Sequence, residues 1–349
     1  MDKTSDVWFP HRAPEILCEL PKYRIMVIGD IMLDEYIYGN VDRISPEAPV
    51  PVVAVNAETR VCGGAANVAM NLRNLGAHVV LAGFIGDDRA GNFILKELRR
   101  EKIETDCVIT NTLQPTGIKT RIIAHNQHVV RVDRERAFAV SESARITLTD
   151  RINETLPRIS GVILSDYRKG VLSAELVSKI IFDANKDGRF IVVDPKQPAY
   201  SFYNNCTVIT PNKHEAGVAV GRTLRTDTDV WKAGRELLSI THASAVLITR
   251  GAEGMTLVER GVRRTCFQIP AIERAMYDAT GAGDTVIATF AAAMATGATL
   301  RESAMLANIA ASVVVGELGT SAITAGKLMN ITRTLRRREF RPYMMEDCT

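Results

Sequence analysis

The segment best suited to chemistry is Asp278-Ala279-Thr280-Gly281-Ala282-Gly283-Asp284, which leads directly into the apolar stretch 285–294. That stretch predicts a buried helix, so the Gly-Ala-Gly turn lies at a helix start. Free N–H groups point outward from such a turn, the helix dipole adds positive charge, and glycines let a phosphate approach the backbone. We therefore predict an anion-binding turn at 281–283, with Asp284 placed to take a proton from an attacking hydroxyl. The alternative is an acidic residue that only complements the helix dipole.

A second segment, Gly63-Gly64-Ala65-Ala66-Asn67, has paired glycines at the start of another predicted helix. The glycines allow a ligand to come close, and the Asn67 amide can both donate and accept hydrogen bonds. These groups suit the recognition of a sugar hydroxyl. They also fit a helix that packs tightly against a strand.

Both segments need a scaffold, and the strand pattern predicts a doubly wound α/β fold with a mostly parallel sheet covered by helices on both faces. Short β-branched runs that are apolar on both faces are separated by helical patterns, which is typical of such a sheet. The runs are 24–28, 79–85, 161–164, 190–193, 208–210 and 246–249. Polar residues follow each run, and parallel strands bring their carboxyl ends to one ligand-binding edge. For any single strand, ordinary turn chemistry explains them equally well.

Two segments, Asp34–Asn56 and Gly117–Asp133, alternate with period two and do not fit inside a parallel sheet. The second contains the predicted hairpin turn Ala124-His125-Asn126-Gln127. We expect a small antiparallel sheet that projects over the edge of the main sheet as a lid and pairs two subunits into a homodimer. The alternative is a peripheral decoration without function.

The composition excludes several other classes of protein. The chain has 349 residues, 46% hydrophobic and 24% charged, which is a globular balance. Its net charge of +3 comes from an Arg-rich C-terminus, so we expect no nucleic-acid partner. We find no membrane-spanning stretch, signal peptide or disulfide framework, and expect a cytoplasmic protein. We divide the chain into an N-terminal extension (1–22), a main domain (23–332) and a basic C-terminal tail (333–349).

Two common nucleotide-binding fingerprints are missing from the sequence. There is no Walker pattern, and no Gly-x-Gly-x-x-Gly follows the first predicted strand. These absences disfavour a P-loop protein and a nicotinamide dehydrogenase.

Four motifs resemble those of the ribokinase-like (PfkB) sugar kinases in order and spacing, over about 24–331. They are Gly63–Asn67, Gly83–Asp87, Asn212–Glu215 and Asp278–Asp284. Within that family, the segments 28–34, 43–53, 164–170 and 193–196 are similar to the bacterial kinases of D-glycero-β-D-manno-heptose 7-phosphate. In many bacteria that kinase is fused to a nucleotidyltransferase domain with a His-x-Gly-His motif. Because this chain lacks the motif, it resembles the stand-alone form.

The resemblance implies a role for each matching residue. Asp284 would be the catalytic base, and the backbone of 281–283 would hold the transferring phosphoryl group. Sugar hydroxyls would be bound by Asp34, Gly63, Gly64 and Asn67. ATP would be bound by Asn212, Glu215, Thr249, Arg250, Gly251 and Asn308, with Glu215 organising Mg²⁺ chiefly through water. Some relatives also hold a monovalent cation such as K⁺, and the sequence does not reveal that site.

The position of a substrate phosphate is inferred from the cations. Lys119 and Arg121 share one face of the lid hairpin by period two. Lys169 and Lys196 follow strand ends at the sheet edge, as does Asp166, a further candidate for binding the substrate. A dianion needs converging cations, and Arg can bind it through two N–H groups. Each cation taken alone also fits a solvated surface charge.

The expected reaction is transfer of the γ-phosphoryl group of Mg·ATP to the 1-hydroxyl of the heptose 7-phosphate. The resemblance places the 1,7-bisphosphate product on the route to ADP-heptose and the lipopolysaccharide core. One alternative is another sugar or sugar-phosphate kinase of the same fold. A second alternative is a nucleotide-binding regulator without catalysis, which the intact set of Asp284, Glu215 and the glycine turn disfavours.

Overall fold

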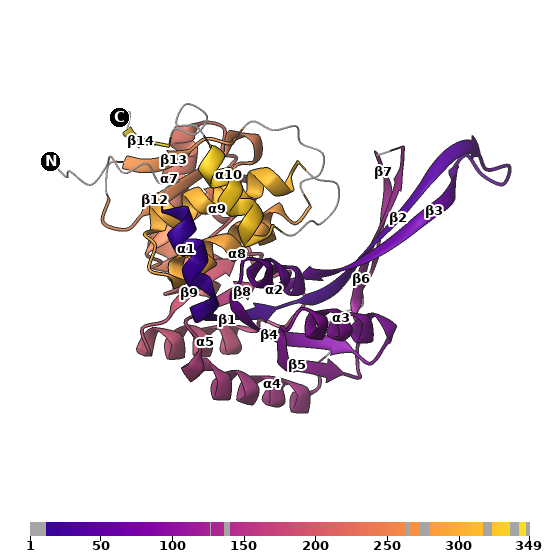
Figure 1. The fold of residues 1–349 in the computed structure, drawn as a ribbon, viewed down its shortest axis with the longest axis horizontal. Helices are drawn as coiled ribbons and strands as arrows, with labels where there is room; N and C mark the ends of the chain where they lie inside the picture. The colour runs from indigo at the N-terminus through magenta and orange to yellow at the C-terminus, as the bar shows by residue number, and fades with distance from the viewer. Residues whose placement is uncertain are drawn as a thin grey trace.

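A ten-stranded sheet forms the centre of the computed structural model, and seven of its neighbouring strands run parallel (Figure 1). In spatial order these are β5 (Glu104–Asn111), β4 (His78–Gly86), β1 (Arg24–Gly29), β8 (Gly161–Ser165), β9 (Phe190–Asp194), β10 (Val208–Ile209) and β11 (Ala245–Thr249). Three antiparallel strands extend the sheet: β12 (Met255–Glu259), β13 (Thr265–Ile269) and β14 (Tyr343–Glu346). The structure describes residues 12–125, 127–135, 140–262, 265–272, 280–316, 323–335 and 342–346.

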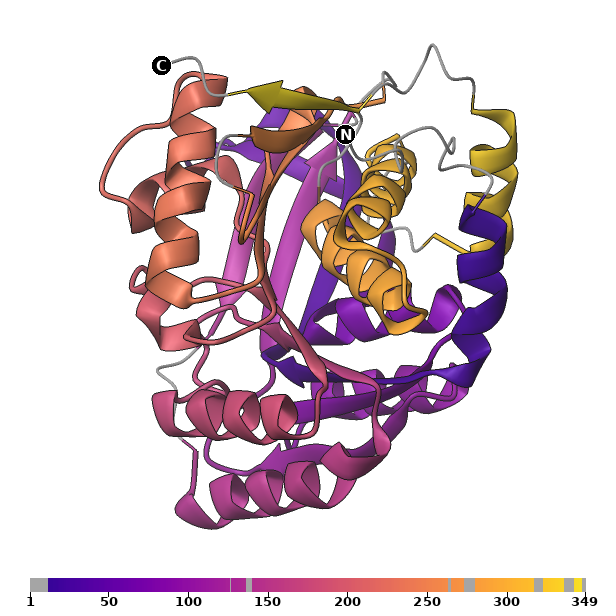
Figure 2. The same cartoon turned by 90° about the vertical axis from the view of Figure 1, so that its left-hand side faces the viewer.

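Helices cover both faces of this sheet, and the strands are apolar on both sides for that reason. In β1, Ile25 and Val27 join one buried cluster, whereas Met26 and Ile28 join the other. The first face is covered by α1 (Ala13–Glu19), α2 (Ala65–Asn74), α3 (Arg89–Arg100), α8 (Ala282–Ala295), α9 (Leu300–Val314) and α10 (Ala325–Thr334). The second is covered by α4 (Glu142–Thr155), α5 (Ala174–Lys186), α6 (Lys213–Ala219) and α7 (Asp227–Thr241). Figure 2 shows the yellow and orange C-terminal helices and the salmon-coloured α7 on opposite sides of the twisted sheet.

The predicted fold class is confirmed, and each of the six predicted strands lies within one residue of its observed bounds. The sequence analysis did not identify β5 or the antiparallel β12, β13 and β14. In the predicted N-terminal extension, the apolar side of α1 is buried against the main core through Ala13, Ile16 and Leu17. Some residues of the predicted motifs lie outside the described ranges, namely Asp278, Ala279, Asn126 and the tail arginines 336–338 and 341.

A separate four-stranded sheet projects from the body of the molecule, which confirms the predicted small second sheet (Figure 1). We call these four strands the lid; they are β3 (Pro51–Gly64), β2 (Ile31–Ile44), β6 (Gly117–Ala124) and β7 (Gln127–Arg134). The β2–β3 and β6–β7 pairs are antiparallel hairpins, and the central β2–β6 pair that joins them is parallel. Among the described residues, no helix is long and apolar enough to cross a lipid bilayer.

Asp30 joins β1 to the lid and also fixes the loop that follows β8. Its side chain is 2% exposed and accepts backbone N–H groups from Tyr167 (2.9 Å), Lys169 (3.0 Å) and Val171 (3.1 Å). Burial raises the pKa of Asp30, and these three donors oppose that effect. The loop from 166 to 171 is therefore folded around a carboxylate at the end of the neighbouring strand.

Candidate active site

Asp284 lies in the first turn of α8, as predicted, and its side chain is only 5% exposed. The helix begins after Gly281, whose φ of +79° is in the left-handed region that favours glycine. One carboxylate oxygen of Asp284 accepts a hydrogen bond from Asn67 Nδ2 at 2.7 Å. The other accepts from the Tyr167 hydroxyl, also at 2.7 Å. Donors from α2 and from the loop after β8 therefore hold the predicted base.

The surroundings of Asp284 suit proton transfer near neutral pH. Burial raises the pKa of Asp284 to about 6, while the bonds from Asn67 and Tyr167 act in the opposite direction. A general base works best when its pKa is close to the working pH. At pH 7 the side chain is mostly ionised and still has appreciable affinity for a proton.

A cavity of about 180 Å³ opens above Asp284 at the carboxyl ends of the parallel strands. Several predicted site residues line it, namely Asp166, Lys196, Asn212, Glu215, Thr249, Gly281, Gly283 and Asp284. Ala282 is the first residue of α8. Apart from α8 itself, no atom of the described residues lies within 4 Å of the point where a side chain would begin at Gly283, so the described part of the chain leaves room there for a ligand.

The far wall of this cavity is acidic. Asn212 and Glu215 form the capping box of α6, with each side chain accepting the other's backbone N–H group. The second Glu215 oxygen lies 2.6 Å from Lys196 Nζ. Desolvation, and then the charges of Asp284 and Glu215, raise the pKa of Asp194 well above its usual value. An excess of negative charge in a phosphate-sized cavity favours a bound cation.

Three residues that the resemblance assigned to ATP lie outside the lining of this cavity. The Arg250 side chain is 6% exposed and binds Asp227 at 2.5 Å and Glu253 at 2.8 Å. Gly251 begins the short turn that ends in Glu253, and Asn308 Nδ2 donates to the backbone carbonyl oxygen of Pro270 at 2.9 Å. In this structure these residues hold the loops beside the cavity.

The predicted sugar-binding residues meet where the lid joins the body. A side chain at Gly63 would begin 2.3 Å from Asp34 Oδ2, so only glycine allows the carboxylate to lie there. Gly64 caps α2 with a φ of +59°. Asp34 forms a buried ion pair with Arg121 across the β2–β6 pair. Asn67 binds Asp284, so in this structure its amide holds the base.

The other predicted phosphate-binding cations have separate partners. Lys119 lies beside Asp34 in the strand register, and its Nζ is 5.4 Å from the centre of the Tyr167 ring. Burial lowers the pKa of Lys119. Lys169 forms an ion pair with Glu135. Lys119, Arg121 and Lys169 therefore belong to the lid side of the site, whereas Lys196 faces Glu215.

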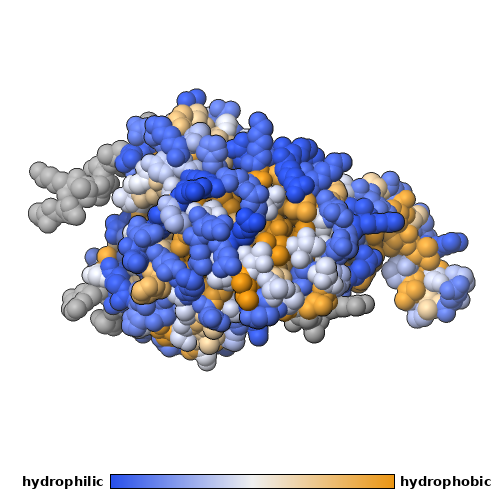
Figure 3. Space-filling view, turned by 90° about the horizontal axis from the view of Figure 1, so that it is seen from below, coloured by the Kyte–Doolittle hydropathy of each residue, from blue (hydrophilic) through white to orange (hydrophobic). Residues whose placement is uncertain are grey.

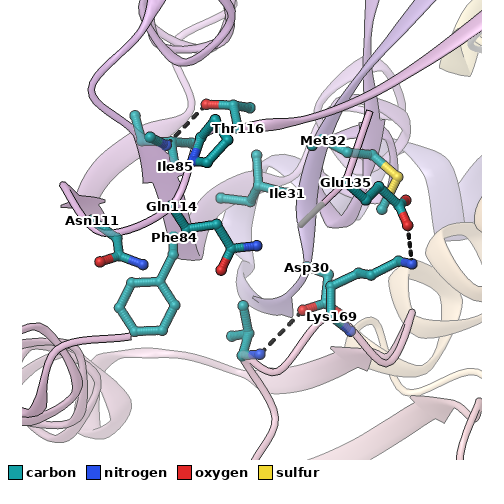
Figure 4. Close-up of a pocket in the computed structure, with 14 residues that line it drawn as sticks. Asp30, Ile31, Met32, Phe84, Ile85, Asn111, Gln114, Thr116, Glu135 and Lys169 are labelled. Carbon is teal, nitrogen blue, oxygen red and sulfur yellow. Dashed lines mark hydrogen bonds and ion pairs between the residues drawn. The ribbon is translucent and has the colours of Figure 1, made fainter. Parts of the chain in front are cut away.

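A second, smaller cavity of about 40 Å³ adjoins the lid side (Figure 4). Ile31, Met32 and Phe84 supply apolar lining, and Lys169 and Glu135 reach toward each other on one side of it. Met32 also packs beside Gly63 and Gly64, so this cavity is close to the predicted sugar-binding residues.

Sequence reasoning did not assign a site role to Tyr167, Asp194 or Asp30. Asp30 directly follows β1, Tyr167 is the second residue after β8, and Asp194 is the last residue of β9, so their position at strand ends was the available signal. Their partners are far apart in the chain, so no local pattern shows which group each one contacts.

The chain belongs to the pfkB family of carbohydrate kinases, because the model of that family matches residues 22–325. The resemblance to the ribokinase-like sugar kinases is thereby confirmed. The chain is 41% identical over 305 residues to the bifunctional protein HldE of Paramagnetospirillum magneticum, covering 87% of this chain and 62% of that protein. It is 42% identical over 322 residues to HldE of a Caulobacter species, covering 91% and 65%. The chain thus spans less than two thirds of the length of these relatives.

Solved structures share the same fold. Phosphofructokinase-2 of Escherichia coli, in complex with potassium, superposes with a TM-score of 0.74 at 22% identity, over 89% of this chain and 98% of that one. Ribokinase of Arabidopsis thaliana, complexed with ribose and ATP, gives 0.71 at 19% identity, over 90% and 99%. At these identities the likeness concerns the fold alone.

Asp284→Asn should increase the stability of the folded protein above pH 6. Burial raises the pKa of Asp284 from 3.8 to about 6, so the ionised side chain disfavours folding. This loss of unfolding free energy is absent below the pKa of Asp284 in the unfolded chain and grows as the pH rises. Above the pKa of Asp284 in the folded protein it is complete and amounts to about 3 kcal/mol. Asn can keep both hydrogen bonds, because the Tyr167 hydroxyl can also accept one. Denaturant unfolding from pH 4 to 8 measures the difference in unfolding free energy between the variant and the wild type. A gain in stability that does not vary with pH would contradict the raised pKa of Asp284.

Proposed function

We propose that this protein transfers the γ-phosphoryl group of Mg·ATP to a hydroxyl of a phosphorylated sugar. The acceptor is D-glycero-β-D-manno-heptose 7-phosphate, and the products are the 1,7-bisphosphate and ADP. The observation that carries the proposal is the buried carboxylate of Asp284 beside the open N-terminus of α8 in a phosphate-sized cavity. The choice of heptose rests on the segments 28–34, 43–53, 164–170 and 193–196. Both substrates are metabolites of the cytoplasm, where we place the reaction.

The proposed chemistry needs one proton transfer and one displacement. The acceptor oxygen attacks the γ-phosphorus, the bond from that phosphorus to the bridging oxygen breaks, and ADP leaves with the bond's electrons. Asp284 takes the proton of the attacking hydroxyl. N–H groups at the start of α8 and the helix dipole stabilise charge on the phosphoryl oxygens.

The donor set fits Mg²⁺ held largely by the nucleotide. Within the described ranges, no three His, Cys, Asp or Glu side chains are grouped to hold a metal ion. Mg²⁺ usually keeps several waters and binds one or two carboxylates together with substrate phosphates. Glu215 and Asp194 would supply those carboxylates. Burial is the main cause of the raised pKa of Asp194, and a cation would offset the further effect of the Asp284 and Glu215 charges. The bound ion would supply charge neutralisation on the phosphates.

On the acceptor side, Asp34 and the amides near Gly63 and Gly64 would bind the sugar hydroxyls. The substrate phosphate would bind the lid-side cations Lys119, Arg121 and Lys169. Arg121 is buried beside Asp34, so an anion that binds Arg121 brings the attached sugar to Asp34 as well.

The lid also carries exposed apolar residues, which we propose form a dimer interface. Val130 and Val132 lie two residues apart on β7 and are 48% and 42% exposed. Ile44, Val50 and Val55 are more than half exposed on the β2–β3 hairpin. Figure 3 shows apolar atoms on this projecting lobe, which a second copy of the chain would cover.

Asp284→Asn should lower kcat by about 10²-fold or more while the KM for each substrate changes little, as expected for loss of a general base. ADP release is measured with a panel of phosphorylated and unphosphorylated sugars. The exposed residue Asp187 supplies the control, Asp187→Asn. Near-normal turnover by the Asp284 variant would remove Asp284 as the base. Lack of ADP production by the wild type with every sugar would contradict the function itself.

Arg121→Ala and Lys119→Ala should each raise the KM for the sugar phosphate by about tenfold or more, because each removes a charged hydrogen-bond donor from the anion. The KM for ATP should stay close to normal. Lys96→Ala on the exposed face of α3 is the matched control. An unchanged KM for the sugar phosphate in either variant would exclude that cation from the phosphate site.

Charged residues at the lid valines should weaken the proposed dimer. Val130→Glu combined with Val132→Glu places like charges in an apolar contact, so we expect a concentration-dependent shift from dimer to monomer. Sedimentation velocity over a hundredfold concentration range measures it. A wild-type monomer at every concentration, or a variant dimer as tight as the wild type, would exclude this interface.

A further inference from the structure

The Tyr167 side chain lies between the proposed base and the lid. Its hydroxyl donates to Asp284 Oδ1 at 2.7 Å, and Lys119 Nζ lies 5.4 Å from the centre of its ring. Its backbone N–H donates to Asp30 at 2.9 Å. The backbone, ring face and hydroxyl of this residue are therefore each held by a different element.

We propose that Tyr167 is a positioning residue that keeps the Asp284 carboxylate ionised and oriented toward the acceptor hydroxyl. This inference rests on the proposed function, in which Asp284 is the base. Asn67 binds Oδ2 and Tyr167 binds Oδ1, so two bonds from opposite sides fix the plane of the carboxylate. Each oxygen retains a lone pair, and the wall formed with Gly281 and Gly283 leaves that side open to the cavity.

The phenol is suited to this role because it remains a donor. Burial, together with the neighbouring Asp284, raises the pKa of Tyr167 well above 10, so the hydroxyl keeps its proton throughout the working range. A donor to a carboxylate stabilises the ionised form, which partly offsets the cost of burying Asp284. Without this donor, a larger fraction of Asp284 would be protonated, and therefore inactive as a base, at neutral pH.

Other charges also act on Asp284 and Tyr167 from the elements around them. They are Asp34 on β2, Lys119 on β6 and Asp194 at the end of β9. The two aspartates favour protonation of their neighbours, and Lys119 favours ionised Asp284. Lys119 also attracts the ring face, which links the position of the lid to the orientation of the phenol.

Tyr167→Phe tests the proposal, because it keeps the ring under Lys119 and removes only the hydroxyl. The measurement is the pH dependence of kcat/KM for the sugar phosphate between pH 5 and 9.5. Loss of a hydrogen bond to a charged group should move the acidic limb of the profile to higher pH by about one unit. At pH 6.5 the variant should be several-fold slower than the wild type, and most of that loss should disappear at pH 9. The acceptor phosphate is the same in both proteins, so a difference between their profiles belongs to the enzyme.

Tyr200→Phe is the matched control. The Tyr200 hydroxyl is buried and lacks a hydrogen-bond partner among the described residues, so its removal should leave the acidic limb in place. A Tyr167→Phe profile with an unmoved limb and a uniform loss of rate would overturn the proposal and leave a purely structural role.

A double-mutant cycle provides a second readout. If Tyr167 acts through Asp284, then Tyr167→Phe should cause little further loss in the Asp284→Asn protein. Full additivity of the two losses would overturn the proposal. A wild-type protein that phosphorylates no sugar would instead refute the proposed function, so the two failures can be told apart.

Discussion

The structure depends on how a charged carboxylate is kept inside it. A buried Asp284 without donors would be strongly disfavoured, and both of its donors come from parts of the chain more than 100 residues away. Asn67 brings α2 against α8, and a second pair, Thr285 Oγ1 to Asn71 Oδ1 at 3.1 Å, lies one turn along the α2 helix. The position of the proposed base is thus set by the same contacts that align two core helices. A shift of either helix would break a hydrogen bond to a charge as well as apolar packing.

Asp30 is a second buried carboxylate stabilised by hydrogen bonds, and its donors are backbone N–H groups. The loop from 166 to 171 has buried N–H groups that no strand partner satisfies, and the Asp30 carboxylate accepts three of them. Because Asp30 directly follows β1, the end of that strand decides where the Tyr167 and Lys169 backbones lie. A carboxylate in this position is therefore a structural anchor, and its raised pKa reflects burial rather than catalysis. Asp30 also lines the second cavity, but its three donors are backbone N–H groups of one loop, whereas the two donors of Asp284 are side chains.

The parts of the fold that local pattern determines could be predicted, and the parts that depend on distant partners could not. The six apolar strands and the helix after Asp284 follow from periodicity and from where polar residues begin. In contrast, β5 has the polar sequence of an edge strand, and its pairing with β4 depends on tertiary context. The sequence predicts that the Asn67 amide binds a sugar hydroxyl, but it does not show the Asp284 carboxylate to which Asn67 Nδ2 donates. Arg250 was assigned to ATP, whereas its guanidinium is held by Asp227 and Glu253. In each case the residue type was informative, and the direction of the side chain was the missing information.

The ion pairs around the two cavities suggest why three cations of this site each have an acidic partner. Arg121 pairs with Asp34, Lys169 with Glu135, and Lys196 with Glu215. A cation left alone in a half-buried site would destabilise the fold, so each needs an acidic partner when substrates are absent.

In the proposed reaction, a phosphate replaces the carboxylate beside each cation, and the released acids gain new partners. Asp34 then accepts bonds from sugar hydroxyls, and Glu215 becomes available to hydrated Mg²⁺. Breaking the existing ion pairs reduces the net affinity for the phosphorylated substrate. A sugar without a phosphate, however, has no anion that could replace the Asp34 carboxylate at Arg121. In the proposed reaction, the arrangement that pairs these cations when no substrate is bound would therefore select for an anionic acceptor.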